Sequence, residues 1–109
     1  RPAASVKMIG SRQLCGIIGA EQDQGIVLLD IRTPEEIAKG GAIPGALNIK
    51  INDLRDNLEV LPRDKEIVIL CGSGRRSMVA ASLLKMEGFE RLCVPLGGVA
   101  GWKAACSAK

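Results

Sequence analysis

The chain has 109 residues with 15 Lys and Arg against 12 Asp and Glu, a formal net charge of +3, and 47% of its residues are hydrophobic. This length and composition predict one soluble globular domain over residues 1–109, with its core between about residues 6 and 105. The weak positive charge and the scarcity of aromatic residues (Phe89 and Trp102) argue against a nucleic-acid partner, and no apolar run reaches the roughly 18 residues that a membrane span needs.

Short apolar runs alternate with helical segments along the chain. Five runs predict strands, at residues 6–8, 26–31, 46–49, 66–71 and 92–94. The second and fourth are apolar almost throughout, which is typical of strands covered on both faces. Helices are expected at residues 11–18, 34–40, from 53 to about 61, 76–87 and after Gly98. This alternation predicts an α/β fold with a mainly parallel sheet of about five strands and helices on both faces.

Local signals mark several helix ends. Ser11 is expected to cap the first helix, and Thr33, Pro34 and Glu36 have the spacing of a capping box with proline at the first helical position. Gly88 should end the helix that starts at residue 76, in the left-handed conformation. The buried side of that helix is expected to consist of Val79, Ala80, Leu83, Leu84 and Met86.

The chain has no histidine and no tyrosine, so a Ser-His-Asp or Cys-His pair and a His-containing zinc site are excluded within it. The four cysteines, Cys15, Cys71, Cys93 and Cys106, form no Cys-x-x-Cys pair, so we expect no metal and no cofactor. We expect free thiols in a reducing compartment, which favours a cytoplasmic location. A processed periplasmic form stays open, because the chain starts at Arg1 rather than at an initiator Met.

Cys71 closes the fourth predicted strand, and a loop rich in glycine and arginine follows it. The residues of this loop are Gly72, Ser73, Gly74, Arg75, Arg76 and Ser77. Ligands of a parallel sheet bind beyond the carboxyl ends of its strands, where Cys71 and Asp30 are expected. Glycines let backbone N–H groups converge on one point, and the next helix adds its positive end. A thiol here should ionise readily, so we favour a reactive Cys71 over one that only fills the core.

Two nucleotide-binding interpretations fit this loop poorly. Residues 72–77 lack the third glycine of a dinucleotide-binding turn, and no acidic residue ends the next strand. The phosphate-binding pattern G-x-x-x-x-G-K-[ST] is absent as well.

Four segments, in the right order, resemble the rhodanese family of single-domain sulfurtransferases over about residues 6–103. Cys71, Gly74, Arg76 and Ser77 match the family pattern C-x-x-G-x-R-S. Asp30 and Arg32, with Glu35 and Glu36, match D-x-R…E, and residues 41–46 match G-H-I-P-G-A. Gly97, Gly98 and Trp102 match G-G-x-x-x-W. Ala42 departs from the family, which often has histidine there, and this bears on loop packing or substrate contacts more than on the chemistry.

The resemblance implies a three-layer α/β sandwich and a sulfurtransferase that works through a Cys71 persulfide. The implied partners are a small anionic sulfur donor (thiosulfate or a persulfide), a thiol or cyanide acceptor, and a sulfur-relay protein. It also implies that four residues between cysteine and arginine, as between Cys71 and Arg76, suit sulfur transfer, whereas related phosphatases and arsenate reductases have five. A non-catalytic interaction module is the main alternative, and a phosphatase or arsenate reductase is a less favoured one.

The persulfide mechanism implies roles for the arginines and for the backbone of the loop. The N–H groups of residues 72–77 are expected to stabilise the persulfide, and Arg75 and Arg76 to attract the anionic donor. Arg76 could equally fold back and hold the loop.

The polar residues around the loop are expected to support it. Asp30 and Arg32 are interpreted as a structural ion pair or as backbone hydrogen-bonding groups, because a carboxylate beside the thiolate would oppose its ionisation. Glu36 is expected to pair with Arg32, and Ser73 and Ser77 to donate hydrogen bonds. The other three cysteines are interpreted as structural or incidental, with a resolving thiol at Cys106 as a less favoured role.

Overall fold

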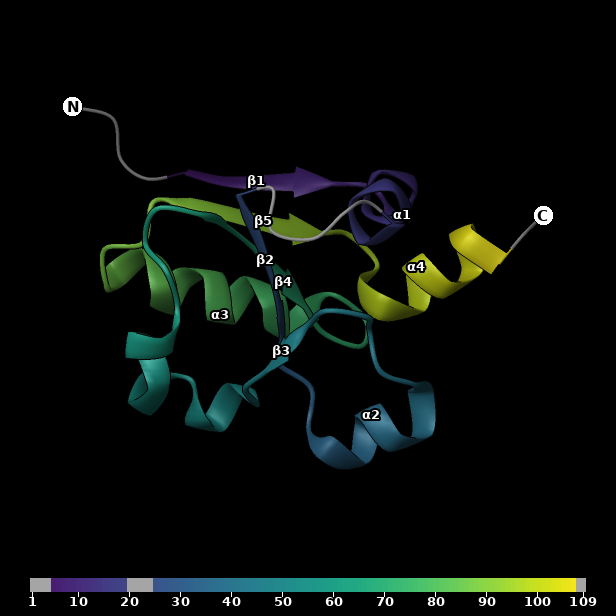
Figure 1. The fold of residues 1–109 in the computed structure, drawn as a ribbon, viewed down its shortest axis with the longest axis horizontal. Helices are drawn as coiled ribbons and strands as arrows, with labels where there is room; N and C mark the ends of the chain where they lie inside the picture. The colour runs from purple at the N-terminus through teal and green to yellow at the C-terminus, as the bar shows by residue number, and fades with distance from the viewer. Residues whose placement is uncertain (1–4, 20–24, 108–109) are drawn as a thin grey trace.

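The computed structural model describes residues 5–19 and 25–107. Within them, one parallel sheet has the strand order β1-β5-β4-β2-β3 (Figure 1). Its strands are β1 (Ser5–Ile9), β2 (Ile26–Asp30), β3 (Leu47–Asn48), β4 (Glu66–Leu70) and β5 (Arg91–Pro95). The helices are α1 (Ser11–Gly19), α2 (Pro34–Gly40), α3 (Arg75–Met86) and α4 (Gly98–Ser107), with two 3-10 helices, η1 (Ile51–Asp53) and η2 (Arg55–Val60). The predicted α/β class is confirmed.

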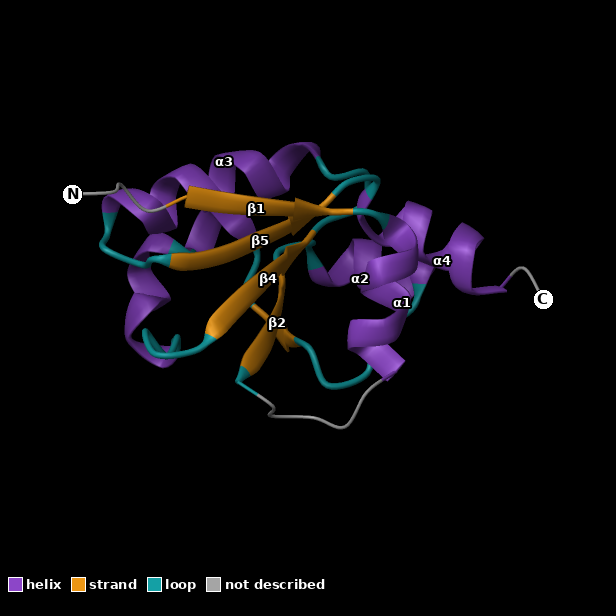
Figure 2. Ribbon diagram, turned by 90° about the horizontal axis from the view of Figure 1, so that it is seen from above, coloured by secondary structure: helices purple, strands orange, loops and turns teal. Residues whose placement is uncertain are grey.

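The central strand is β4, which lies between β5 and β2. Residues 67–70 of this strand are fully buried, because both faces of the sheet are covered. Leu70 pairs with Asp30 of β2, so both strands end at the same edge of the sheet. Figure 2 shows α2 and α4 at this end, to which the strand arrows point. The topology therefore brings Asp30 and Cys71, which follows β4, to one edge.

Two hydrophobic clusters cover the two faces of the sheet. One joins the sheet to α3 and the 3-10 helices, with Leu29, Ile69, Leu84, Phe89 and Val94 among its buried members. The other joins it to α1 and the start of α4, with Leu14, Ile18, Leu28, Cys93 and Val99 among its buried members. Trp102 of α4 packs against this second cluster while remaining half-buried.

Most helix ends follow their local signals. Thr33 and Glu36 form the full capping box, and Pro34 occupies the first turn of α2. Gly88 follows α3 with φ +94°. Ser11 departs from the prediction, because its hydroxyl donates to the carbonyl of Leu96 at 3.4 Å. The first helix bond of α1 instead runs from Leu14 N–H to the Gly10 carbonyl.

The buried side of α3 was predicted wrongly at two positions. Val79 is 63% and Met86 is 82% exposed, whereas the helix buries Ser77, Ala80, Ala81 and Leu84. With 3.6 residues per turn, this small-residue arc lies opposite Val79 and Met86. The two alanines let α3 approach the sheet closely, so packing selected the small residues over the larger apolar ones.

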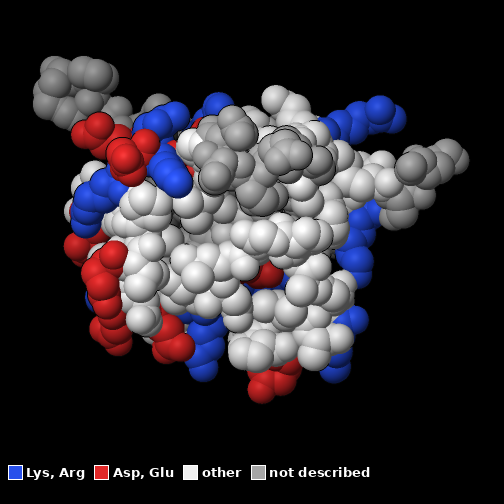
Figure 3. Space-filling model, viewed as in Figure 1, with Lys and Arg blue, Asp and Glu red and all other residues white. Residues whose placement is uncertain are grey.

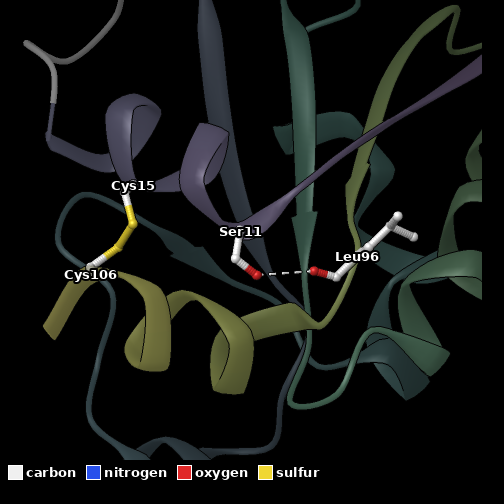
Figure 4. Close-up of a disulfide and its surroundings, with 4 residues drawn as sticks. All are labelled: Ser11, Cys15, Leu96 and Cys106. Atoms are coloured by element: carbon white, nitrogen blue, oxygen red, sulfur yellow. Dashed lines mark hydrogen bonds between the residues drawn. A yellow bond between two sulfur atoms is a disulfide. The ribbon is translucent and has the colours of Figure 1, made fainter. Parts of the chain in front are cut away.

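The expectation of four free thiols is wrong for two of them. A disulfide joins Cys15 of α1 to Cys106 of α4, 91 residues apart in sequence (Figure 4). Cys71 and Cys93 are free and buried. The cysteines therefore no longer support a reducing compartment, because stable disulfides are typical of oxidising ones. No helix in the described part of the chain is long and apolar enough to cross a membrane.

Candidate active site

Cys71 lies at the carboxyl end of β4, directly before the loop that leads into α3. Its Sγ accepts a hydrogen bond from the N–H of Gly74 at 3.0 Å. Gly74 has φ +95°, a conformation that glycine adopts without steric cost, and it directly precedes α3. The positive end of the helix dipole and this N–H therefore both favour negative charge on the sulfur. Cys71 itself is fully buried beneath the loop.

The carbonyl side of the same loop is held by the first turn of α4. The N–H of Val99 donates to the Cys71 carbonyl at 2.8 Å, and the N–H of Ala100 donates to the Gly72 carbonyl at 3.0 Å. Gly98 makes this approach possible, because a Cβ there would overlap the Cys71 carbonyl oxygen and lie 2.6 Å from the Gly74 nitrogen. With its carbonyls bound to α4, the peptide chain can turn the N–H of Gly74 toward the sulfur.

Arg76 and Glu36 form a two-point ion pair between α3 and α2. Nη1 and Nη2 of Arg76 donate to Oε1 and Oε2 of Glu36 at 2.8 and 2.6 Å. Glu36 also accepts from the Thr33 N–H. The hydrogen bonds from Arg76 and then from Thr33 lower the pKa of Glu36 from 4.5 to about 2. The guanidinium of Arg76 is thus bound to Glu36 of α2 in the structure.

Asp30 and Arg32 form a separate, buried pair, so the expected pairing of Glu36 with Arg32 is wrong. Arg32 Nη2 lies 2.8 Å from Asp30 Oδ2, and both residues are at most 3% exposed. The backbone N–H of Arg32 also donates to Asp30, and Nη2 donates to the Gly41 carbonyl. The structural ion pair expected for Asp30 and Arg32 is thus present, and it fixes the turn between β2 and α2 near the loop.

The remaining loop residues divide into anchored and exposed ones. Ser77 is fully buried, and its hydroxyl donates to the Ile69 carbonyl of β4 at 3.1 Å, so it anchors α3 to the sheet. Ser73 and Arg75 are exposed. Arg75 therefore places a positive charge at the surface of the loop, where an incoming anion would meet it.

A pocket of about 380 Å³ lies beside the loop. Its walls are Arg32, Glu36, Lys39, Gly40, Gly72, Val99, Ala100 and Lys103. Two of the charged groups are compensated, since Arg32 pairs with Asp30 and Glu36 with Arg76. Lys39 and Lys103 add positive charge, and Lys103 also donates to the Gly40 carbonyl across the pocket. The pocket thus joins the backbone of Gly72 to a basic rim.

The charge on the face drawn in Figure 3 is unevenly distributed. Its right-hand edge, where Figure 1 places α2 and α4, carries Lys and Arg side chains, whereas Asp and Glu gather mainly at the left. Basic side chains therefore lie on the side of this face to which the strands point, with acidic side chains below them over the start of α2.

Ala42, the departure from the family pattern, does not line the pocket beside Gly72. It is exposed and lines another pocket, of about 310 Å³, together with Asp30, Asn48 and five other residues. Cys93 is also remote from the chemistry, because it belongs to the core cluster around α1. Burial, and next the charge of Glu66, raise the pKa of Cys93 to about 11.

Sequence reasoning missed three groups of this site: Gly98, the Val99 and Ala100 N–H donors, and the lysines of the pocket. The Gly97-Gly98 pair was a signal for the first two, although it was related only to the start of the last helix and to the family pattern G-G-x-x-x-W. The close approach of α4 to the Cys71 carbonyl explains why glycine stands at position 98.

Comparisons with known proteins place the chain among sulfur-transferring relatives. The family model described as Rhodanese-like domain matches residues 17–105. The chain is 38% identical over 89 residues to YtwF of Bacillus subtilis, covering 82% of this chain and 84% of that protein. It is 36% identical over 97 residues to a protein named sulfurtransferase from Allochromatium vinosum, covering 89% of this chain and 88% of that one.

The fold is similar to solved structures as well. A rhodanese-like domain protein from Staphylococcus aureus is 28% identical with a TM-score of 0.78, covering 88% of this chain and 90% of that chain. Because the family model spans most of the chain and the relatives match over nearly their whole length, the protein belongs to the rhodanese-like domain family.

Proposed function

We propose that the protein is a sulfurtransferase in which Cys71 carries the transferred sulfur. The observation that carries this proposal is the position of Cys71 Sγ. It lies at the end of the central strand and accepts a hydrogen bond from the N–H of Gly74, the residue directly before the positive end of α3. Reactive cysteines occupy such electropositive helix starts. The family and the relatives named as sulfurtransferases support the same chemistry.

The proposed reaction has two displacements. The Cys71 thiolate attacks the outer sulfur of a donor such as thiosulfate, the S–S bond of the donor breaks, and sulfite leaves with the electron pair. The charge remains on the terminal sulfur of the Cys71 persulfide. An acceptor thiolate or cyanide then attacks that sulfur and regenerates the thiolate, so ping-pong kinetics are expected.

The chain's own groups have separate tasks in this reaction. The N–H of Gly74, which faces Sγ in the resting state, stabilises negative charge on the reacting sulfurs. Arg75, Lys39 and Lys103 draw the anionic donor toward the loop. Arg76 positions the loop through Glu36 and is not available to a substrate while that pair persists.

Transfer also requires the loop to move, because Cys71 is fully buried in the resting structure. Residues 72–74 include two glycines, so this segment can change its backbone angles at low steric cost. The pocket beside Gly72 gives a donor a place to bind before the sulfur is uncovered.

The proposal is tested by thiocyanate formation from thiosulfate and cyanide. We expect turnover by the wild-type protein and none by Cys71→Ser, while Cys93→Ser keeps wild-type turnover as a matched control. If wild type and Cys71→Ser are both inactive with thiosulfate and with glutathione persulfide, the interaction module becomes the better account. Hydrolysis of a phosphoryl substrate by wild type alone would favour a phosphatase.

A further inference from the structure

The first turn of α4 supports the active loop, but little of α4 is buried. Of its residues up to Cys106, only Gly98 and Val99 are buried, and the others are exposed or half-buried. A helix of ten residues is not stable by itself in water, so its position depends on its neighbours. The packing of Val99 in the core fixes the first turn of α4, and the last turn has to be fixed by contact with another element.

The helix next to α4 is α1, which lies close to both the start and the end of α4 (Figure 4). At the start of the two helices, a Cβ on Gly101 would lie 2.5 Å from Ser11 Oγ, so the backbones are close. The Ser11 hydroxyl also donates to the Leu96 carbonyl, just before α4. Further along, the disulfide joins Cys15 to Cys106, whose Cα atoms are 5.8 Å apart.

We propose that the Cys15–Cys106 disulfide is a positioning device for the active loop and acts through α4. It fastens the last turn to α1, and the first turn then presents the N–H groups of Val99 and Ala100 to the carbonyls of Cys71 and Gly72. Opening the bond frees the last turn of α4 from α1, while Val99, Trp102 and Lys103 still hold the earlier turns. The loop then loses its single arrangement over Cys71.

The bond is open to exchange, because Cys15 and Cys106 are half-buried rather than enclosed. One thiolate of a dithiol reductant attacks the sulfur of one cysteine, forms a mixed disulfide with it and releases the other cysteine as a thiolate. The second thiol of the reductant then attacks the mixed disulfide, releases the remaining cysteine and closes a cyclic disulfide. Two electrons and two protons pass in this way from the dithiol to Cys15 and Cys106, which become thiols. Sulfur transfer by this protein is thereby linked to the dithiol redox state around it.

Two readouts change in opposite directions. Without the bond, a looser loop uncovers Cys71 more often, so a neutral alkylating reagent reaches the sulfur faster. Sulfur transfer needs the loop to open and then to close again over the bound donor. It becomes slower without the bond, because the closed loop then aligns the reacting atoms and the N–H of Gly74 less well. Misplacement by about 1 Å can slow an enzymatic reaction by up to about a hundredfold, and we expect about three- to tenfold here.

The first test compares the oxidised wild type with the Cys15→Ser/Cys106→Ser double variant in the rate of Cys71 modification by iodoacetamide, followed by peptide mass. We expect at least about a threefold faster reaction in the double variant, with Cys93 unmodified as the internal reporter of an intact core. Wild type that is reduced with a phosphine and desalted should match the variant, and re-oxidation should restore the slow rate.

Equal rates at Cys71 in the two proteins overturn the proposal. Modification of Cys93 together with Cys71 also overturns it, because the bond would then hold the whole fold rather than the position of α4. Neither result depends on the reaction that the protein catalyses.

The second test rests on the proposed function and measures the rate of persulfide formation with thiosulfate. We expect the double variant to be about three- to tenfold slower, and Gly16→Ala, an exposed position on α1 next to Cys15, to keep the wild-type rate. A double variant as fast as wild type contradicts the positioning role. Absence of any persulfide on wild type contradicts the proposed function and leaves the alkylation test to decide on the disulfide.

Discussion

Arg76 and Glu36 connect α3 to α2 through two parallel hydrogen bonds of 2.8 and 2.6 Å, although 40 residues separate them in sequence. Glu36 also closes the capping box of α2, so one carboxylate serves both the start of that helix and the active loop. Under the proposed function, this pair makes Arg76 a positioning residue. The anionic donor is then bound by Arg75 and by the lysines of the pocket.

Arg76→Lys should lower kcat for sulfur transfer about tenfold and change the KM for thiosulfate by less than about twofold. Lysine keeps the charge but cannot form the planar two-point contact with Glu36, so the loop loses alignment more than attraction for the donor. Steady-state kinetics with thiosulfate and cyanide measure both constants. A large rise in KM with kcat unchanged would show that Arg76 binds the donor directly.

Arg75→Ala should have the opposite signature, a rise in the KM for thiosulfate of about two- to fivefold with a small effect on kcat. Arg75 is exposed, and the attraction between an exposed charge and an anion is worth about 1 kcal/mol or less. Added salt should shrink the difference between Arg75→Ala and wild type, because exposed charges are screened. Arg75→Lys is the matched control and should retain most of the affinity. An unchanged KM in Arg75→Ala would contradict a role in donor binding.

The Glu36–Arg76 pair should make a pH-dependent contribution to stability. The pKa of Glu36 is lowered to about 2 in the folded protein from 4.5, so the pair stabilises the folded state fully above about pH 4.5 and is lost as the pH falls toward 2. Because both side chains are more than a third exposed, solvent screening limits the contribution to about 1 kcal/mol or less.

Urea unfolding of wild type and Glu36→Gln at pH 7 and at pH 2 checks this dependence. The free energies of unfolding should differ at pH 7 and approach each other at pH 2, where Glu36 of the wild type is about half protonated. An equal difference at both pH values would assign the effect of the substitution to packing or capping rather than to the charge.

Gly98→Ala should destabilise the fold by roughly 2–5 kcal/mol, the sum of a left-handed backbone and a forced overlap. Gly98 has φ +60°, and its new Cβ would meet the carbonyl of Cys71 and the nitrogen of Gly74. Gly16→Ala is the matched control, because a Cβ there meets nothing within 4 Å and should stabilise α1 slightly. Thermal unfolding measures both variants. A Gly98→Ala protein with the stability of wild type would mean that α4 does not hold the loop this closely.

Much of this architecture could be predicted because its signals are local. The apolar run of β4, the capping box at Thr33 and the loop after Cys71 each lie within a few neighbouring residues, where propensity and hydrogen bonding decide the structure. The position of Cys71 and Asp30 at one edge followed from the rule for parallel strands, since Leu70 pairs with Asp30.

The features that escaped prediction depend on contacts between distant segments. The partner of Arg76 is set by where α2 lies relative to α3, and the partner of Cys15 by where α4 lies relative to α1. A sequence pattern can indicate that a side chain needs a hydrogen-bonding or disulfide partner. It does not indicate which partner, because that depends on how distant segments come together in the fold. The exposed side of α3 was misjudged for a similar reason, because packing against the sheet selected Ala80 and Ala81 over Val79.

A persulfide on Cys71 can be detected directly in the intact mass of the protein after incubation with thiosulfate and then with cyanide. Wild type should gain the mass of one sulfur atom, and Cys71→Ala should gain none. Cyanide should remove the added sulfur and release thiocyanate. An unmodified wild type with both thiosulfate and glutathione persulfide, or a sulfur gained equally by Cys71→Ala, would contradict a Cys71 persulfide.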